Sequence, residues 1–214
     1  MSRVETLLQE QAVDLKPYLE QVSRTGITLV PNLIPPDSLQ VLRSFCNKLT
    51  YESLNEKDGE VHKRFLYAAG YTSQQQEVLT ILGENIRQKL SKYKDDFPAL
   101  ETWEPNDFTV QKYDLNSHLS SHIDAPDYEG VVVVVSVQGE AFFEARNERH
   151  GEPFVAWRLK PGDGVILRAK GFDPDPDKQT GPFHLVYGAA TKEDRISIGI
   201  AEDPTIFQGF QQMS

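Results

Sequence analysis

The stretch Ser121-His122-Ile123-Asp124-Ala125 is the part of the sequence around which the rest of the fold can be predicted. Side chains two residues apart in a β-strand point to the same face. A strand here would therefore aim the imidazole of His122 and the carboxylate of Asp124 at one point. His184 begins a second strand-like run, His-Leu-Val-Tyr, and can bring another imidazole to that point. We predict that these three side chains meet, although they come from two separate strands.

Two histidines and one carboxylate are a set of metal ligands that leaves other coordination positions open, as in non-haem Fe(II) oxygenases. The same ligand types also suit zinc, so the set alone does not identify the metal. A zinc hydrolase needs a general base, and nothing in the sequence supplies a convincing one. The alternative for His184 is a core histidine that is hydrogen-bonded to the backbone. We interpret His118, four residues before His122, as lying outside the ligand set, either exposed or behind it.

An arginine and a serine follow His184 in a second strand pattern, Arg-Ile-Ser-Ile-Gly-Ile. Arg195 and Ser197 share one face of this pattern because they are two residues apart. The opposite face is apolar and consists of Ile196, Ile198 and Ile200. A guanidinium beside a hydroxyl group is well suited to bind a carboxylate. This pair therefore predicts a binding site for an anionic group.

Short strand patterns alternate with turns rich in glycine, proline and aspartate throughout residues 103–201. Many short strands with regular turns favour an antiparallel double-sheet jelly roll over a βαβ fold. Residues 171–182 carry several prolines and aspartates and are expected to form an exposed loop before His184. The expected strands are 109–113, 131–137, 141–145, 154–159, 165–168, 183–187 and 195–201.

The first hundred residues predict a strand and two helices that brace one face of the sheet. Residues 26–30 have a strand pattern, and residues up to about 18 indicate a weak helix or an arm. Pro35-Pro36-Asp37-Ser38 is a helix start signal. The helix that follows carries one apolar face, so Cys46 is predicted to be a buried structural thiol. That face consists of Leu39, Leu42, Phe45, Cys46 and Leu49.

The second helix is expected over residues 73–93. Ser73 and Gln76 have the spacing of a capping box, and the predicted buried stripe is Val78, Leu82, Ile86 and Leu90. Residues 55–62 are polar and contain Asp-Gly, which favours a turn or loop. Residues 64–71 fit a short strand or a lid, so the role of the 62–76 segment, as a lid or as core, stays open.

Length and composition favour one soluble domain. The 214 residues are 39% apolar and 25% charged. We divide them into a supporting region at 1–100, a jelly-roll core at 101–203 and a tail at 204–214. The net charge of −10 argues against a broad nucleic-acid surface. A single cysteine excludes an internal disulfide and favours a reducing compartment. There is no secretory signal pattern, and the longest apolar run, 131–135, is too short to cross a bilayer. We expect a cytoplasmic protein without a membrane partner.

The segment from Tyr113 to Asp124, Tyr-Asp-Leu-Asn-Ser-His-Leu-Ser-Ser-His-Ile-Asp, resembles the Fe(II)/2-oxoglutarate-dependent oxygenases. Its spacing is similar to that of the AlkB-type branch in particular. Tyr113 stands nine residues before the first ligand, in the place of a tyrosine that contacts 2-oxoglutarate in that branch, and Leu119 also matches. The turn at residues 159–165, Leu-Lys-Pro-Gly-Asp-Gly-Val, looks like the family's Pro-Gly-Asp turn. The resemblance covers roughly the last half of the chain.

The resemblance implies a cupin-like double-stranded β-helix that uses Fe(II), 2-oxoglutarate and O2. By this resemblance the iron ligands are His122, Asp124 and His184. Arg195 would pair with the distal carboxylate of 2-oxoglutarate, and Ser197 and Tyr113 would add hydrogen bonds. The sequence departs from the AlkB pattern at two positions. Ala201 replaces a second arginine six residues after the first, and Gln111 replaces an asparagine.

The leading hypothesis is a dioxygenase that hydroxylates, or otherwise oxidises, a C–H bond of a small-molecule or amino-acid-like substrate and releases succinate and CO2. One alternative is an AlkB-like oxidative demethylase of nucleic acid or of a protein side chain. Ala201 and the acidic net charge argue against the nucleic-acid version. Another alternative is a cupin-type protein that binds a metal or ligand without oxygenase activity. The sequence identifies neither the substrate, nor the oligomeric state, nor the choice between hydroxylation, desaturation and cyclisation.

Overall fold

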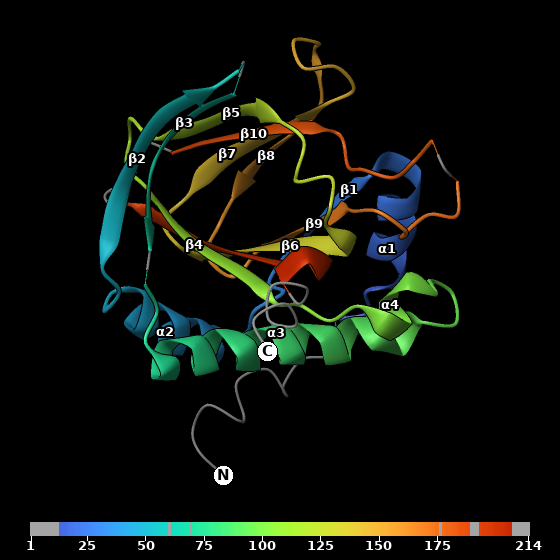
Figure 1. The fold of residues 1–214 in the computed structure, drawn as a ribbon, viewed down its shortest axis with the longest axis horizontal. Coiled ribbons are helices and arrows are strands. Elements are labelled where there is room, and N and C mark those ends of the chain that lie inside the picture. The colour runs from blue at the N-terminus through green and yellow to red at the C-terminus, as the bar shows by residue number, and fades with distance from the viewer. Residues whose placement is uncertain (1–12, 60, 69, 176, 189–192, 207–214) are drawn as a thin grey trace.

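A computed structural model describes residues 13–59, 61–68, 70–175, 177–188 and 193–206 (Figure 1). Within these residues the helices are α1 (Lys16–Thr25), α2 (Pro36–Cys46), α3 (Ser73–Leu90) and α4 (Ala99–Thr102), with a short 3-10 turn at Ser91–Tyr93. The strands are β1 (Ile27–Val30), β2 (Tyr51–Asp58), β3 (Val61–Ala68), β4 (Asp107–Tyr113), β5 (His118–His122), β6 (Glu129–Gln138), β7 (Ala141–Arg146), β8 (Pro153–Leu159), β9 (Gly164–Arg168), β10 (Phe183–Gly188) and β11 (Arg195–Glu202).

The strands form one antiparallel sheet in the order β1-β9-β6-β11-β4-β3-β5-β10-β7-β8, with β2 paired to β3. The sheet curls over itself into two facing layers (Figure 1). One layer holds β1, β9, β6, β11 and β4, and the other holds β5, β10, β7 and β8. Strand β3 joins the layers because it pairs with both β4 and β5. Strands from β4 onward cross repeatedly between the layers, which confirms the predicted jelly roll.

The valine run of β6 explains the central position of this strand. Val131, Val133 and Val135 contribute to the hydrophobic core that includes the helices. Val132, on the opposite face, contributes to the core between the two layers. A strand that is buried on both faces reads as a continuous apolar run rather than an alternating one. The sequence therefore places β6 in the interior of the domain.

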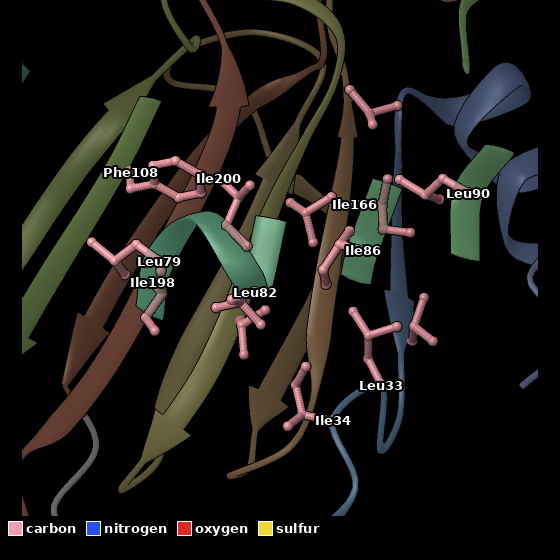
Figure 2. Close-up of a cluster of buried hydrophobic side chains, with 14 of the residues drawn as sticks. Leu33, Ile34, Leu79, Leu82, Ile86, Leu90, Phe108, Ile166, Ile198 and Ile200 are labelled. Atoms are coloured by element: carbon pink, nitrogen blue, oxygen red, sulfur yellow. The ribbon is translucent and has the colours of Figure 1, made fainter. Parts of the chain in front are cut away.

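Helix α3 lies lengthwise under the layer that contains β4, β6 and β9 (Figure 1). Its side chains pack on that layer together with side chains of β4, β9 and β11. Figure 2 shows this contact, which involves Leu79, Leu82, Ile86 and Leu90 of the helix and Phe108, Ile166, Ile198 and Ile200 of the strands. Leu42 and Cys46 of α2 belong to the same core. This confirms that two helices brace one face of the sheet.

The N-cap of α3 differs from the prediction by one residue, whereas Leu82, Ile86 and Leu90 of the predicted stripe are buried. The capping box is formed by Thr72 and Gln75, in which the Thr72 hydroxyl accepts from the Gln75 N–H and the Gln75 side chain accepts from the Thr72 N–H. The predicted pair, Ser73 and Gln76, has the same spacing, so sequence spacing alone could not choose between them. At the first position of the stripe, Leu79 is buried and Val78 is only partly buried.

The turn or loop predicted at residues 55–62 is wrong in its extent, because the chain turns at Gly59 and most of the other residues are strand. Strand β2 continues to Asp58 and β3 begins at Val61, so the pair forms a hairpin with Gly59 in the left-handed region. Most of β2 is exposed, and an exposed edge strand carries polar residues without an apolar alternation to reveal it. Residues 64–68 are strand, which agrees with one of the two alternatives for that segment.

The N-terminal prediction is partly right. Helix α1 extends to Thr25, well beyond the weak helix or arm expected up to about residue 18, and Leu19 and Val22 fix it to the core. Residues 1–12 of that arm, and 207–214 of the expected tail, lie outside the described residues. The division into support, core and tail stays a prediction. In the described residues, no helix has the length and apolarity that crossing a membrane requires.

Candidate metal centre and adjoining cavities

The three predicted ligand side chains lie together. His122 is the last residue of β5 and is the register partner of His184 on β10. The centroids of their rings are 4.2 Å apart, and Nε2 of His184 is 3.6 Å from Oδ1 of Asp124. One potential ligand atom from each of the three residues lies within 4.8 Å of the other two. We call these three residues the triad.

The route by which Asp124 reaches the triad differs from the prediction. Strand β5 ends at His122, so Asp124 is not on the same strand but in the loop that follows. The prediction that His122 and Asp124 share one strand is therefore wrong. The conclusion that the two side chains approach one point still agrees with the structure, because the loop returns Asp124 towards β10.

Backbone carbonyls orient both imidazoles. Nδ1 of His122 lies 2.9 Å from the carbonyl oxygen of Ser120, and Nδ1 of His184 lies 3.2 Å from that of Pro182. A carbonyl oxygen only accepts hydrogen bonds, so each Nδ1 carries the proton and donates it. Nε2 of each ring then keeps a free lone pair. This is the arrangement that holds a histidine ligand in one tautomer. Phe143 stacks on the His184 ring and fixes its plane.

Burial controls the charge of the triad. It lowers the pKa of His184 to about 4. It also lowers the pKa of His122 to about 4, and repulsion from His184 adds to this effect. Both imidazoles are therefore neutral at pH 7 and can donate lone pairs. Burial raises the pKa of Asp124, since it removes water from the carboxylate. A bound cation would reverse that effect.

The triad lines an inner cavity of about 120 Å³ between the two layers. The apolar part of its wall includes Leu119, Val132, Phe143 and Val186. Its polar part comes from β4, β11 and the segment before β6, and consists of Asp107, Thr109, Gln111, Tyr128 and Arg195.

Arg195 is a buried cation on this wall. Its side chain is 2% exposed, and its guanidinium carbon lies 5.0 Å from the ring centroid of Tyr113, its register partner on β4. None of the ion pairs among the described residues includes Arg195, and its Nε has no hydrogen-bond partner. Burial lowers the pKa of its guanidinium. A buried charge without a counter-ion costs several kcal/mol, so this position is suited to an anionic ligand.

Tyr113 and Ser197 are placed close to Arg195 but not on the cavity wall. Both are buried, at 1% exposure. The hydroxyl of Tyr113 donates to Oε1 of Gln111 at 2.8 Å, and Gln111, the register partner of Ser197, does line the cavity. The roles expected for Tyr113 and Ser197 as cosubstrate contacts stay predictions.

Sequence reasoning missed three polar residues of the wall, Asp107, Thr109 and Tyr128. Asp107 and Thr109 lie on β4 at the same two-residue period as Gln111, so counting back from Gln111 could have found them. Tyr128 donates from its hydroxyl to Oδ2 of Asp107 at 2.6 Å. It precedes β6 in a turn, and no pattern in the sequence indicated its position.

An outer cavity of about 550 Å³ adjoins the inner one and shares His122, Asp124 and Tyr128 with it. The β2–β3 hairpin supplies one side of its wall, namely Leu54, Asp58, Val61, Lys63, Phe65 and Tyr67. Strand β3 is therefore a fixed strand of the sheet that also borders the site. His118 lies outside the triad and pairs with His62, with Nε2 and Nδ1 3.2 Å apart.

No protein-family model matches the sequence, and no curated protein matches it. Solved structures do share the fold. A 2OG-Fe(II) oxygenase family oxidoreductase from Burkholderia pseudomallei is 15% identical, with a TM-score of 0.61 over 89% of this chain and 91% of that chain. The non-haem α-ketoglutarate-dependent epimerase SnoN from nogalamycin biosynthesis is 14% identical, with a TM-score of 0.60 over 87% and 82%. OsALKBH1 is 14% identical, with a TM-score of 0.56 over 84% and 99%. At these identities the likeness is one of fold.

Proposed function

We propose that this protein is an Fe(II)- and 2-oxoglutarate-dependent dioxygenase. It oxidises a C–H bond of a small-molecule or amino-acid-like substrate, in the simplest case by hydroxylation, and releases succinate and CO2. The observation that carries the proposal is one cavity whose wall holds both the triad and Arg195, a buried guanidinium that has no acidic partner among the described residues. The shared fold with a 2OG-Fe(II) oxygenase family oxidoreductase supports the class of enzyme.

The donor atoms of the triad fit ferrous iron. Two neutral imidazole nitrogens and one carboxylate oxygen suit Fe(II) and leave positions open for other ligands. When bound, the iron supplies the oxidising chemistry together with O2 and 2-oxoglutarate. The protein contributes ligands that are already oriented, since the carbonyl oxygens of Ser120 and Pro182 fix both rings in the tautomer that binds through Nε2.

Arg195 binds the distal carboxylate of 2-oxoglutarate in this proposal. A guanidinium forms two parallel hydrogen bonds to a carboxylate, which fixes the orientation of the diacid as well as its position. The keto-acid end is then directed towards the triad, which lines the same cavity. Tyr113 and Ser197 add hydrogen bonds near Arg195, and Gln111 places the Tyr113 hydroxyl. The expulsion of water from this part of the cavity strengthens each of these interactions.

The substrate enters through the outer cavity, because that cavity opens beside His122 and Asp124 and is bordered by the β2–β3 hairpin. Its wall includes Leu54, Phe65 and Tyr67, which can hold an apolar part of a substrate. The inner cavity, of about 120 Å³, is too small for a macromolecule. It suits the cosubstrate and the one group of the substrate that reacts.

Succinate release tests this proposal. The purified protein is supplied with Fe(II), O2 and 2-oxoglutarate and screened with amino acids, metabolites and methylated nucleosides for stimulated release. Asp124→Ala should abolish the stimulated release. His118→Ala is the matched control, because it changes a histidine of the same segment that pairs with His62 outside the triad, and it should retain the rate. Full turnover in Asp124→Ala would eliminate the assignment.

An oxidative demethylase of nucleic acid or of a protein side chain is the second candidate, and the shared fold with OsALKBH1 favours it. The net charge of −10 and the alanine at position 201 argue against the nucleic-acid version. Salt-dependent binding of oligonucleotides would support it. A cupin-type binding protein without activity is a third candidate, and it predicts metal binding without any binding of 2-oxoglutarate.

A further inference from the structure

We propose that Asp107, held by Tyr128, is a substrate-binding residue, and that the substrate presents a cationic nitrogen, an amine or a guanidinium, to the Asp107 carboxylate. This inference rests on the proposed function and names the chemical class of its substrate. The dioxygenase chemistry itself does not require it, because neither residue belongs to the triad or to the Arg195 end of the cavity.

The two strands that carry the polar wall, β4 and β11, place opposite charges at the two ends of the inner cavity. On β11 and β4, Arg195 is the register partner of Tyr113, and Ala201 is the register partner of Asp107. The two partner pairs are six residues apart on each strand, which corresponds to about 20 Å of strand length. Arg195 and Asp107 nevertheless line the same inner cavity. One end of this cavity therefore presents a guanidinium, and the other end presents a carboxylate.

The Asp107 carboxylate has no cationic partner in the part of the chain that the structure describes. None of the ion pairs among residues 13–59, 61–68, 70–175, 177–188 and 193–206 includes it. Its Oδ2 accepts the hydrogen bond from the Tyr128 hydroxyl at 2.6 Å. Burial raises the pKa of Tyr128, so this hydroxyl remains a donor. Ala201 faces Asp107 from β11 and offers no polar side-chain atom.

The charges of the two adjoining cavities favour a cationic substrate. The charged side chains on their walls are Arg195, Lys63, Asp58, Asp107 and Asp124. In the loaded enzyme, 2-oxoglutarate neutralises Arg195 and the metal neutralises Asp124. Lys63 is paired with Glu56, with Nζ 3.6 Å from Oε1, and Glu56 does not line either cavity. The acids Asp58 and Asp107 remain, and Asp58 is exposed to solvent, which screens its charge. Asp107 is therefore the strongest uncompensated charge that a substrate meets.

A purely structural role is the competing explanation for Asp107, since it would hold Tyr128 in place. Asp107→Asn separates the two explanations. The asparagine side-chain oxygen can still accept the Tyr128 hydrogen bond, so the variant removes the charge and keeps the contact. A structural role predicts no change in ligand preference in this variant, whereas a substrate-binding role predicts that the preference for a cation is lost.

The experiment uses the full-length protein loaded with Mn(II) and 2-oxoglutarate. Mn(II) takes the place of Fe(II), so that a substrate can bind without turnover. Calorimetry measures its affinity for three matched pairs of probes. They are Nα-acetyl-lysine amide with Nα-acetyl-norleucine amide, Nα-acetyl-arginine amide with Nα-acetyl-citrulline amide, and hexylamine with hexanol. We expect the cationic member of at least one pair to bind about tenfold more tightly or better, as for a hydrogen bond to a charged group. Asp107→Asn should reduce this ratio to below about twofold.

Asp58→Asn is the matched control, because it removes an acid of the outer cavity only and should keep the preference. Equal binding of all pairs, binding of no cationic probe, or a preference that survives in Asp107→Asn would overturn the inference. These outcomes are distinct from failure of the proposed function. If the proposed function were wrong, the wild-type protein would bind neither Mn(II) nor 2-oxoglutarate, and calorimetry would show this before any probe is added.

Discussion

His122 and His184 are register partners on β5 and β10, and their ring centroids are 4.2 Å apart. Each ring is oriented by a hydrogen bond from Nδ1 to a backbone carbonyl oxygen. The fold thereby directs two imidazole lone pairs and the Asp124 carboxylate towards one point. Burial and mutual repulsion keep the pKa of His122 low. A divalent cation should therefore stabilise this arrangement.

Metal binding should raise the unfolding temperature. A ligand at 100 times its dissociation constant adds about 2.7 kcal/mol to the free energy of unfolding. In a chain of this length this corresponds to a shift of roughly 5–10 °C. Thermal unfolding with Mn(II), reversed by EDTA, measures the effect. His184→Ala should abolish the shift, whereas His62→Ala, outside the triad, should retain it. An undiminished shift in His184→Ala would contradict the ligand assignment.

Arg195→Met should have two opposite effects. Loss of the guanidinium should weaken 2-oxoglutarate binding by about 2–5 kcal/mol, because a buried carboxylate would lose its charged partner. The same change should raise the free energy of unfolding without 2-oxoglutarate by about 1–4 kcal/mol, because methionine fills similar space without an unpaired buried charge. Calorimetry and urea unfolding measure the two quantities.

Arg158→Met is the control for this variant. Arg158 is exposed and pairs with Glu140 on the surface, so its replacement should change neither quantity by more than about 0.5 kcal/mol. If Arg195→Met were destabilising and left 2-oxoglutarate binding intact, Arg195 would be a structural residue and not a ligand-binding one.

The thiol of Cys46 should be unreactive in the native protein. Cys46 is completely buried between α2 and the sheet, and burial raises its pKa to about 12. Only the thiolate reacts with alkylating reagents. Raising the pH from 7 to 9 should therefore leave the labelling of the native protein negligible. In urea-unfolded protein the labelling rate should rise steeply over the same pH range, because a free thiol titrates near pH 8.5. Mass spectrometry after iodoacetamide treatment measures both rates, and fast native labelling at pH 9 would refute the burial.

The sequence predicted those features that depend on period and spacing. The two-residue period of β11 assigned Arg195 to one face and the three isoleucines to the other, and the valine run located β6. The parts that were missed depend on tertiary contacts. The hairpin strand β2 is exposed and carries no apolar alternation. Asp124 reaches the triad through a loop, and Tyr128 reaches Asp107 from a turn. No local pattern encodes those two approaches.

The capping of α3 also shows where spacing is insufficient, and two variants can test it. Thr72 and Ser73 both have a glutamine three residues later, at Gln75 and Gln76. In the structure Thr72 is the N-cap and exchanges hydrogen bonds with Gln75. Thr72→Ala should therefore lower the free energy of unfolding by about 1 kcal/mol, the usual cost of losing a cap.

Ser73→Ala should change the stability by less than about 0.5 kcal/mol, or increase it, because Ser73 is the first helical residue and alanine favours a helix. Urea unfolding of both variants measures the difference. A reversed order, with Ser73→Ala the more destabilising change, would move the start of α3 by one residue. The helix would then begin one residue later, and Leu82, Ile86 and Leu90 would keep their places in the core.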